Sequence, residues 1–188
     1  MNTTLSFEML LKIGAFLVSI VLLLKGILEY KKAQNWKKSE FVSKEIKELL
    51  NDFEIKRALV LLDWNANNLS LADNEIENLK YFYFTDELIY NSLKTHRELS
   101  NFSDKEVVIK KIFDNFFDRI GWFDIYIQTG LIETKDIKPY LIYWINIIAD
   151  ETNERKDNDL REQMWRYIKE YNYIDFISIC KKFGFHIR

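Results

Sequence analysis

Two histidines and one cysteine are the residues of this sequence best suited to catalysis or metal binding. Neither His96 nor His186 belongs to an HExxH motif or a Cys/His spacing, so the common zinc signatures are absent from the sequence. The five glycines are scattered, and there is neither a phosphate-binding loop nor a GxSxG elbow. Cys180 falls on the predicted apolar side of a helix and is interpreted as a core residue. We therefore expect no catalytic residue, no cofactor and no metal site, and predict that the protein is not an enzyme.

The spacing between arginine and histidine tests for one ribonuclease motif of small helical domains. RNA-cleaving HEPN domains separate an arginine from a following histidine by four to six residues. The corresponding positions hold Ile89, Tyr90 and Asn91 before His96, and Ile179, Cys180 and Lys181 before His186. None is an arginine, which argues against a ribonuclease of this type. A degenerate relative, or a histidine paired with an arginine distant in sequence, stays open as an alternative.

The remaining polar clusters receive structural interpretations. Asp63-Trp64-Asn65 is interpreted as a helix end with Trp64 in the core, and His96-Arg97 as a capping or surface pair. The carboxylates Asp114, Asp118 and Asp124, mixed with Arg119 on one helix, are predicted to form a solvated face rather than a metal site. The formal net charge of −2 argues against a broad basic surface, so no direct nucleic-acid binding is expected.

The elements that position these residues are predicted to be helices, in an all-α domain spanning residues 31–188. An amphipathic helix continues from the N-terminal segment, a second ends near Trp64, and residues 65–68 form a turn. Residues 80–85, KYFYFT, have the composition of a strand but no evident partner, so a helix or an irregular connection is favoured there, before a helix at 86–96. The strongest helix covers residues 104 to about 129, with Ser103 and Glu106 as a capping box and Gly130 as its stop. Thr134 is predicted to cap the next helix, with Pro139 restricted to its first turn. Two final helices are expected at 160–171 and 174–183. A solvated, mobile loop is expected at 150–159.

The most informative feature is an apolar N-terminal segment from Met9 to Leu28, interrupted only by Lys12 and Lys25. About twenty residues rising ~1.5 Å each match a hydrocarbon core of ~30 Å. The lysines follow this segment, so residues 1–30 are predicted to form a single-pass membrane anchor, with the N-terminus outside and the C-terminal domain cytoplasmic. Contact with membrane lipid is expected at Lys25, Tyr30, Lys31, Lys32, Trp36, Lys37 and Lys38.

Two alternatives compete with the anchor. A cleaved signal peptide begins with positive charge, whereas the first eight residues carry no side-chain cation and no Ala-x-Ala-like site ends the apolar run. A buried core helix would suit the short uncharged stretch from Ile13 to Leu24, although the two flanking lysines can extend toward lipid head groups.

One stripe of this segment combines small and polar residues at the 3.5-residue spacing of a helix-packing seam. Small residues let helices approach closely, and polar residues within a membrane face partners or water. The stripe therefore predicts a homo-oligomer whose helices pack through this stripe around an aqueous lumen. The alternative is that Glu8 and Lys12 only mark the outer end of the span. The stripe residues are Glu8, Lys12, Ala15, Ser19, Gly26 and Glu29.

The chain resembles a family of small membrane proteins from bacterial defence loci. The resemblance is carried by the single N-terminal span, the segment Trp36-Lys37-Lys38-Ser39-Glu40-Phe41 and the helical domain behind it. In particular, the chain is similar to the accessory membrane proteins of type VI-B CRISPR systems. That likeness implies a divergent HEPN-like domain, a ring-shaped pore, an antiviral role and cooperation with an RNA-guided nuclease. The alternatives are a membrane-tethered helical adaptor for a protein or nucleotide partner and a degenerate HEPN-type ribonuclease.

Overall fold

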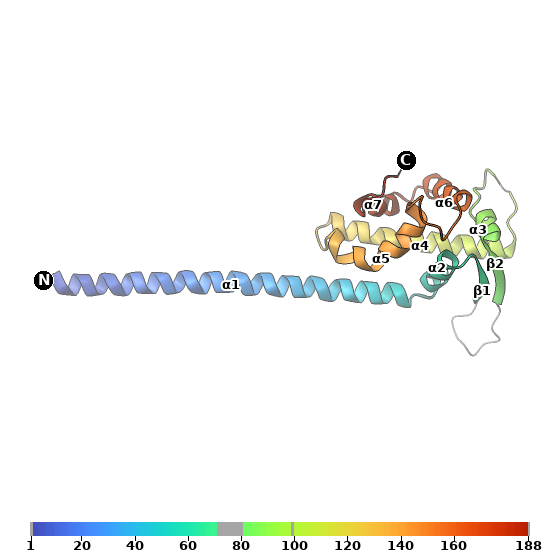
Figure 1. Cartoon of the computed structure of the whole chain (residues 1–188). Helices are drawn as coiled ribbons and strands as arrows, with labels where there is room; N and C mark the ends of the chain where they lie inside the picture. Colours follow the sequence, from blue (N-terminus) through green and yellow to red (C-terminus); the bar gives the residue numbers. More distant parts are fainter. Residues whose placement is uncertain (1, 71–80, 99, 188) are drawn as a thin grey trace. The chain divides into compact units, whose positions relative to one another are not determined.

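The structure is a computed structural model that describes residues 2–70, 81–98 and 100–187, with side chains from residue 7 onward (Figure 1). The described chain is mostly helical, which confirms the predicted fold class in its coarse form. It divides into two compact units, Met1–Phe41 and Val42–Arg188. A domain boundary at residue 30 stays a prediction.

The N-terminal helix α1 (Asn2–Asn51) contains the apolar segment. Its most apolar window has a mean hydropathy of 2.3 and no buried residue, so the helix is long and apolar enough to span a membrane by length and composition. Because the described side chains from Phe7 to Leu28 are exposed, the chain itself does not cover them as it would cover a core helix. The signal-peptide alternative stays open.

The last turns of α1 belong to the second unit, where their pattern changes from apolar to amphipathic. Val42, Ile46 and Leu49 are buried, at the i, i+4 and i+7 positions of one helix face. Asp52 then ends α1 and caps α2 (Phe53–Asp63), because its carboxylate accepts a hydrogen bond from the backbone N–H of Ile55 at 3.1 Å.

Two short strands follow α2, and both correct the sequence-based expectation. β1 (Ala66–Ser70) pairs antiparallel with β2 (Tyr81–Thr85), with Leu69 opposite Phe82. The predicted turn at 65–68 and the helix or irregular connection at 80–85 are therefore wrong. Phe82 and Phe84 are buried while Tyr81 and Tyr83 are exposed, so the alternation of a half-buried strand holds once the partner strand is present.

The longest helix of the second unit, α4 (Asp104–Gln128), follows α3 (Asp86–Ser92) and supplies much of the core. Ser103 and Glu106 form the predicted capping box, and Gly130 has a φ of 72°, a conformation that suits a helix-ending glycine. Helix α3 ends earlier than predicted. The buried aromatic face of α4 includes Phe113, Phe116 and Phe117.

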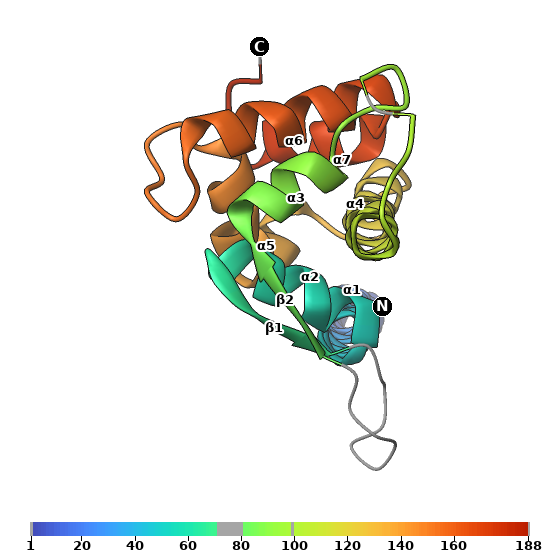
Figure 2. The ribbon, with the colours of Figure 1, turned by 90° about the vertical axis from the view of Figure 1, so that its right-hand side faces the viewer.

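The C-terminal helices α5 (Thr134–Ala149), α6 (Asn158–Glu170) and α7 (Ile174–Lys182) complete the second unit (Figure 2). Helix α7 packs closely on α4, since a Cβ added at Gly121 would lie 3.1 Å from the Cβ of Asp175. Glu133, not Thr134, is the N-cap of α5. Pro139 lies in the second turn of α5, so its expected restriction to the first turn is also wrong.

The connection between α5 and α6 is mostly exposed, as predicted, but it is held in place by one buried residue, Lys156. Lys156 is 3% exposed and donates hydrogen bonds to the carbonyl oxygen of Trp64 at 2.7 Å and to Asp86 at 2.5 Å. Burial lowers the pKa of Lys156 and raises that of Asp86, although the ion pair opposes both shifts. Trp64 contributes its backbone here, while its side chain is 53% exposed rather than in the core.

Replacing Lys156 by methionine tests this anchoring, because Lys156→Met leaves the Asp86 carboxylate and the Trp64 carbonyl without their donor. We expect the free energy of unfolding to fall by about 3 kcal/mol, as for other broken buried pairs. Chemical unfolding of the full chain in detergent, followed by circular dichroism, measures it. Arg155→Met is the matched control: Arg155 forms an exposed pair with Asp63 and its loss should cost under about 1 kcal/mol. Equal losses in both variants would contradict the anchoring role.

Candidate functional site

The predicted stripe on α1 is described from Glu8 onward, and its residues are exposed. The Ser19 hydroxyl donates a hydrogen bond to the carbonyl oxygen of Ala15 at 2.9 Å, so it is satisfied within the helix. A Cβ added at Gly26 would meet nothing within 4 Å, which leaves this position open to a close neighbour. Glu29 pairs with Lys25 at 3.8 Å, and Lys25 lies outside the stripe. Helical geometry alone brings these residues to one face.

The predicted lipid-contacting residues form the segment that follows the apolar stretch. They are exposed apart from Lys38, which is partly covered. Tyr30 and Trp36 are each 65% exposed. Amphipathic aromatic side chains of this kind are enriched at membrane interfaces. Their lipid contact stays a prediction.

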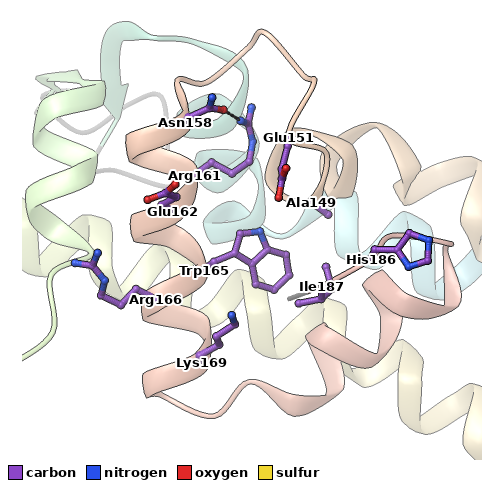
Figure 3. A pocket seen from close by; sticks show the side chains of 10 residues that line it. All are labelled: Ala149, Glu151, Asn158, Arg161, Glu162, Trp165, Arg166, Lys169, His186 and Ile187. Atoms are coloured by element: carbon purple, nitrogen blue, oxygen red, sulfur yellow. Dashed lines mark hydrogen bonds between the residues drawn. The ribbon is translucent and has the colours of Figure 1, made fainter.

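A groove on the second unit, which the sequence interpretation missed, lies between α6 and the residues that follow α7 (Figure 3). Its volume is about 530 Å³. Trp165 lies at its centre, with Lys169 at one side, Glu151 at the other, and His186 and Ile187 from the C-terminal segment (Figure 3). The groove therefore combines an aromatic face, an aliphatic wall and charges of both signs.

Helical spacing accounts for part of this groove. Glu162, Arg166 and Lys169 follow one another at i, i+4 and i+7 on α6, with Trp165 beside them, so these side chains share a region of the helix surface. The Trp165 indole is held in place because its Nε1–H donates to the carbonyl oxygen of Ile148 at 2.9 Å. The sequence contains this spacing, but His186 reaches the groove only through tertiary packing.

Arg161 positions the rim of the groove through bonds within the chain. Its guanidinium donates to the carbonyl oxygens of Ile147 at 3.2 Å and Lys156 at 2.9 Å, to that of Asn153, and to the Asn158 side chain at 2.7 Å. It is 3% exposed, and burial lowers its pKa. Arg161 therefore orders the segment between α5 and α6 rather than offering a charge to a ligand.

Two of the three acidic side chains that were predicted to form a solvated face on α4, Asp114 and Asp124, are structural instead, while Asp118 is exposed as predicted. Asp124 is fully buried and accepts hydrogen bonds from Ser178 at 2.9 Å and Lys182 at 2.5 Å on α7. Asp114 accepts hydrogen bonds from the hydroxyls of Tyr167 and Tyr173. The contacts that cover both carboxylates come from helices more than fifty residues away in sequence.

Lys110, one turn before Asp114, is enclosed by aromatic rings. Its ammonium lies 4.5 Å from the ring centroid of Tyr167, 4.7 Å from that of Tyr171 and 4.8 Å from that of Phe102. It donates to the carbonyl oxygen of Lys94 at 3.1 Å. Burial lowers the pKa of Lys110, and the nearby carboxylates oppose this shift. These contacts fasten the segment before α4 to α4 and α6.

The histidines and the cysteine lie in three separate environments. His96 packs edge-on against Phe102 and Tyr171, while its neighbour Arg97 pairs with Glu170 at 3.2 Å. Cys180 is fully buried, as predicted, and burial raises the pKa of its thiol, so it is a core residue rather than a nucleophile. Among the described residues, no three His, Cys, Asp or Glu side chains are arranged to hold a metal ion.

Comparison with protein-family models, with curated proteins and with solved structures found no match to this chain. Its function is therefore argued from its own residues.

The Glu98 contacts near the groove predict a measurable pH dependence. Glu98 accepts hydrogen bonds from the Thr95 backbone N–H at 2.7 Å and from Arg166 at 2.8 Å, and these lower its pKa to about 2. A lowered folded-state pKa contributes stability above the unfolded value, near 4.5, that is lost as the pH falls toward 2. The free energy of unfolding of Glu98→Gln should therefore be lower than that of the native chain at pH 6, and the difference should shrink from about pH 4.5 downward.

Carboxyl resonances in an NMR titration provide the direct measurement, and Arg166→Gln is the matched comparison. Because the Thr95 hydrogen bond is the largest cause of the shift, Arg166→Gln should raise the pKa of Glu98 only in part. A Glu98 pKa above 4 in the native chain would contradict these contacts.

Proposed function

We propose that the protein is a membrane-anchored effector whose N-terminal helices associate into a homo-oligomer and perturb the bacterial inner membrane. The observation that carries this proposal is the apolar window of α1, none of which is buried by the rest of the described chain. Such a surface needs a bilayer or other helices to cover it. The orientation that agrees with the lysine distribution places the C-terminal domain in the cytoplasm.

The stripe residues on α1 are the candidates for the contact between helices in this proposal. In a bilayer, Lys12 is costly when it faces lipid, and it gains by facing a partner or water. Ser19 is small and its hydroxyl is bonded within the helix, so it lets a second helix approach closely. Gly26 permits close approach of a second helix. Assembly through this stripe would place its polar side chains on the inside of the oligomer, where they would line an aqueous lumen.

The resemblance to accessory membrane proteins of type VI-B CRISPR systems agrees with this mechanism. It adds the hypotheses of an antiviral role, a HEPN-like origin of the second unit and a functional link to an RNA-guided nuclease. None of these is required for assembly through α1.

A membrane-tethered adaptor is the second candidate function, favoured by the groove beside Trp165. In that case, α1 would only hold a ligand-binding domain at the membrane. Exchanging residues 1–30 for an unrelated transmembrane helix discriminates between the two. An adaptor should tolerate the exchange, whereas an effector that works through the stripe should lose its effect on the membrane potential.

Leucine substitutions within the stripe test the leading proposal. Lys12→Leu and Ser19→Leu should lower the mass of the detergent-solubilised complex, or reduce its effect on the membrane potential at least about tenfold. The reason is that both substitutions remove the groups that make one helix face distinct. Light scattering gives the mass, and a potential-sensitive dye in expressing cells gives the depolarisation.

Val21→Leu is the matched control, because Val21 lies on the side of α1 away from the stripe and is also exposed. It should preserve both readouts. A monomeric native chain, or stripe variants with unchanged mass and unchanged depolarisation, would reject the stripe as the functional face.

A further inference from the structure

The groove beside α6 has the dimensions of a small-molecule site. Its volume of about 530 Å³ falls within the roughly 300–1,000 Å³ typical of pockets that enclose a single ligand. It is formed entirely within the second unit, by α6, the end of α5 with the segment after it, and the C-terminal segment.

A fixed aromatic face forms the floor of the groove. The indole N–H of Trp165 donates a hydrogen bond to the Ile148 carbonyl oxygen, and the indole centroid lies 6.3 Å from the ring centroid of Phe176. The ring is thus held by the core, and its partly exposed side faces the groove (Figure 3). A preorganised indole of this kind favours stacking of a flat aromatic ring, since little side-chain freedom remains to be lost on binding.

The charges on the two sides of Trp165 differ in sign. Lys169 lies toward one edge of the indole and Glu151 toward the opposite edge (Figure 3). His186 and Ile187 close the groove from the C-terminal segment. A matching ligand has a flat ring, an anionic group for the lysine side, and hydrogen-bond donors for the carboxylate side.

We propose that this groove binds a mononucleotide with an amino-bearing base. The base stacks on Trp165, its amino group donates to Glu151, and the phosphate lies near Lys169. This inference goes beyond the proposed function and does not depend on membrane assembly, because the site involves no residue of the first unit. It also differs from binding of a nucleic-acid polymer, which would need a continuous basic surface.

Titration calorimetry of the full chain in detergent tests the proposal, with adenosine 5′-monophosphate as the probe. Adenosine and inorganic phosphate are the comparison ligands. Both should bind at least about fivefold more weakly than the nucleotide, because each lacks one of the two recognised groups. Absence of nucleotide binding at millimolar concentration, or phosphate binding as strong as that of the nucleotide, would overturn the proposal.

Paired substitutions locate the binding to this groove. Trp165→Leu and Lys169→Gln should each weaken nucleotide affinity at least about fivefold. For Trp165, fivefold is the lower end of what one base–aromatic stack contributes. Trp122→Leu and Lys111→Gln change an exposed tryptophan and an exposed lysine on α4 and should leave the affinity unchanged. Equal affinity in the site and control variants would reject the groove as the binding site.

A second pair of variants keeps the test independent of folding, because Trp165 is partly buried. Near-ultraviolet circular dichroism checks the fold of each variant. Trp165→Phe retains an aromatic face and should keep part of the affinity. Glu151→Gln, on a surface loop, should weaken nucleotide affinity while leaving phosphate affinity unchanged. Weaker phosphate binding with unchanged nucleotide affinity would contradict the assigned orientation.

Discussion

The uncovered apolar surface of α1 is the constraint on which the rest of the structure depends. A continuous exposed helix of this composition forms an extended apolar surface of the kind that monomeric proteins rarely leave in water. A bilayer removes that cost, because about twenty residues span its hydrocarbon core. The same environment reverses the cost for polar groups, so Lys12 becomes a side chain that requires partners or water, while the Ser19 hydroxyl is already bonded within the helix. In the proposed assembly through α1, the selective contacts would therefore be polar, even though the segment is mostly apolar.

The second unit is held together by a different means, in which buried cations join segments distant in sequence. Lys110 fixes the segment before α4, while Lys156 and Arg161 fix the segment between α5 and α6. Each cation supplies donors to backbone carbonyls that no helix or strand satisfies. Such contacts are stable only when every partner is present, because a buried charge that loses its acceptors carries an uncompensated desolvation penalty. Order in these connections also shapes the rim of the groove beside Trp165.

The sequence predicted the elements whose signals are local and missed those that depend on distant partners. Helix α4 has a strong apolar period and a capping box in adjacent residues, so its bounds were predicted within about a residue. Strand β1, with the sequence ANNLS, has little intrinsic preference for a strand and forms only against the aromatic β2. Asp124 gives no local sign of burial, because α7 covers it through close packing at Gly121. The stripe on α1 was predictable, since one helix defines it, whereas the groove needed His186 and Trp165 to meet through the fold.

The two candidate sites belong to different units, and the peptide bond between Phe41 and Val42 is the covalent link that joins those units. The part of α1 that lies within the second unit offers a covalent route from the groove to the proposed helix assembly. There Val42, Ile46 and Leu49 are buried, and Glu45 accepts a hydrogen bond from Tyr126 at 3.2 Å. Energetic coupling of this kind is reciprocal. If ligand binding favours assembly, then assembly strengthens ligand binding by the same factor. If the two are independent, ligand affinity is the same for the isolated and the assembled chain, and α1 is an anchor whose packing the second unit does not control.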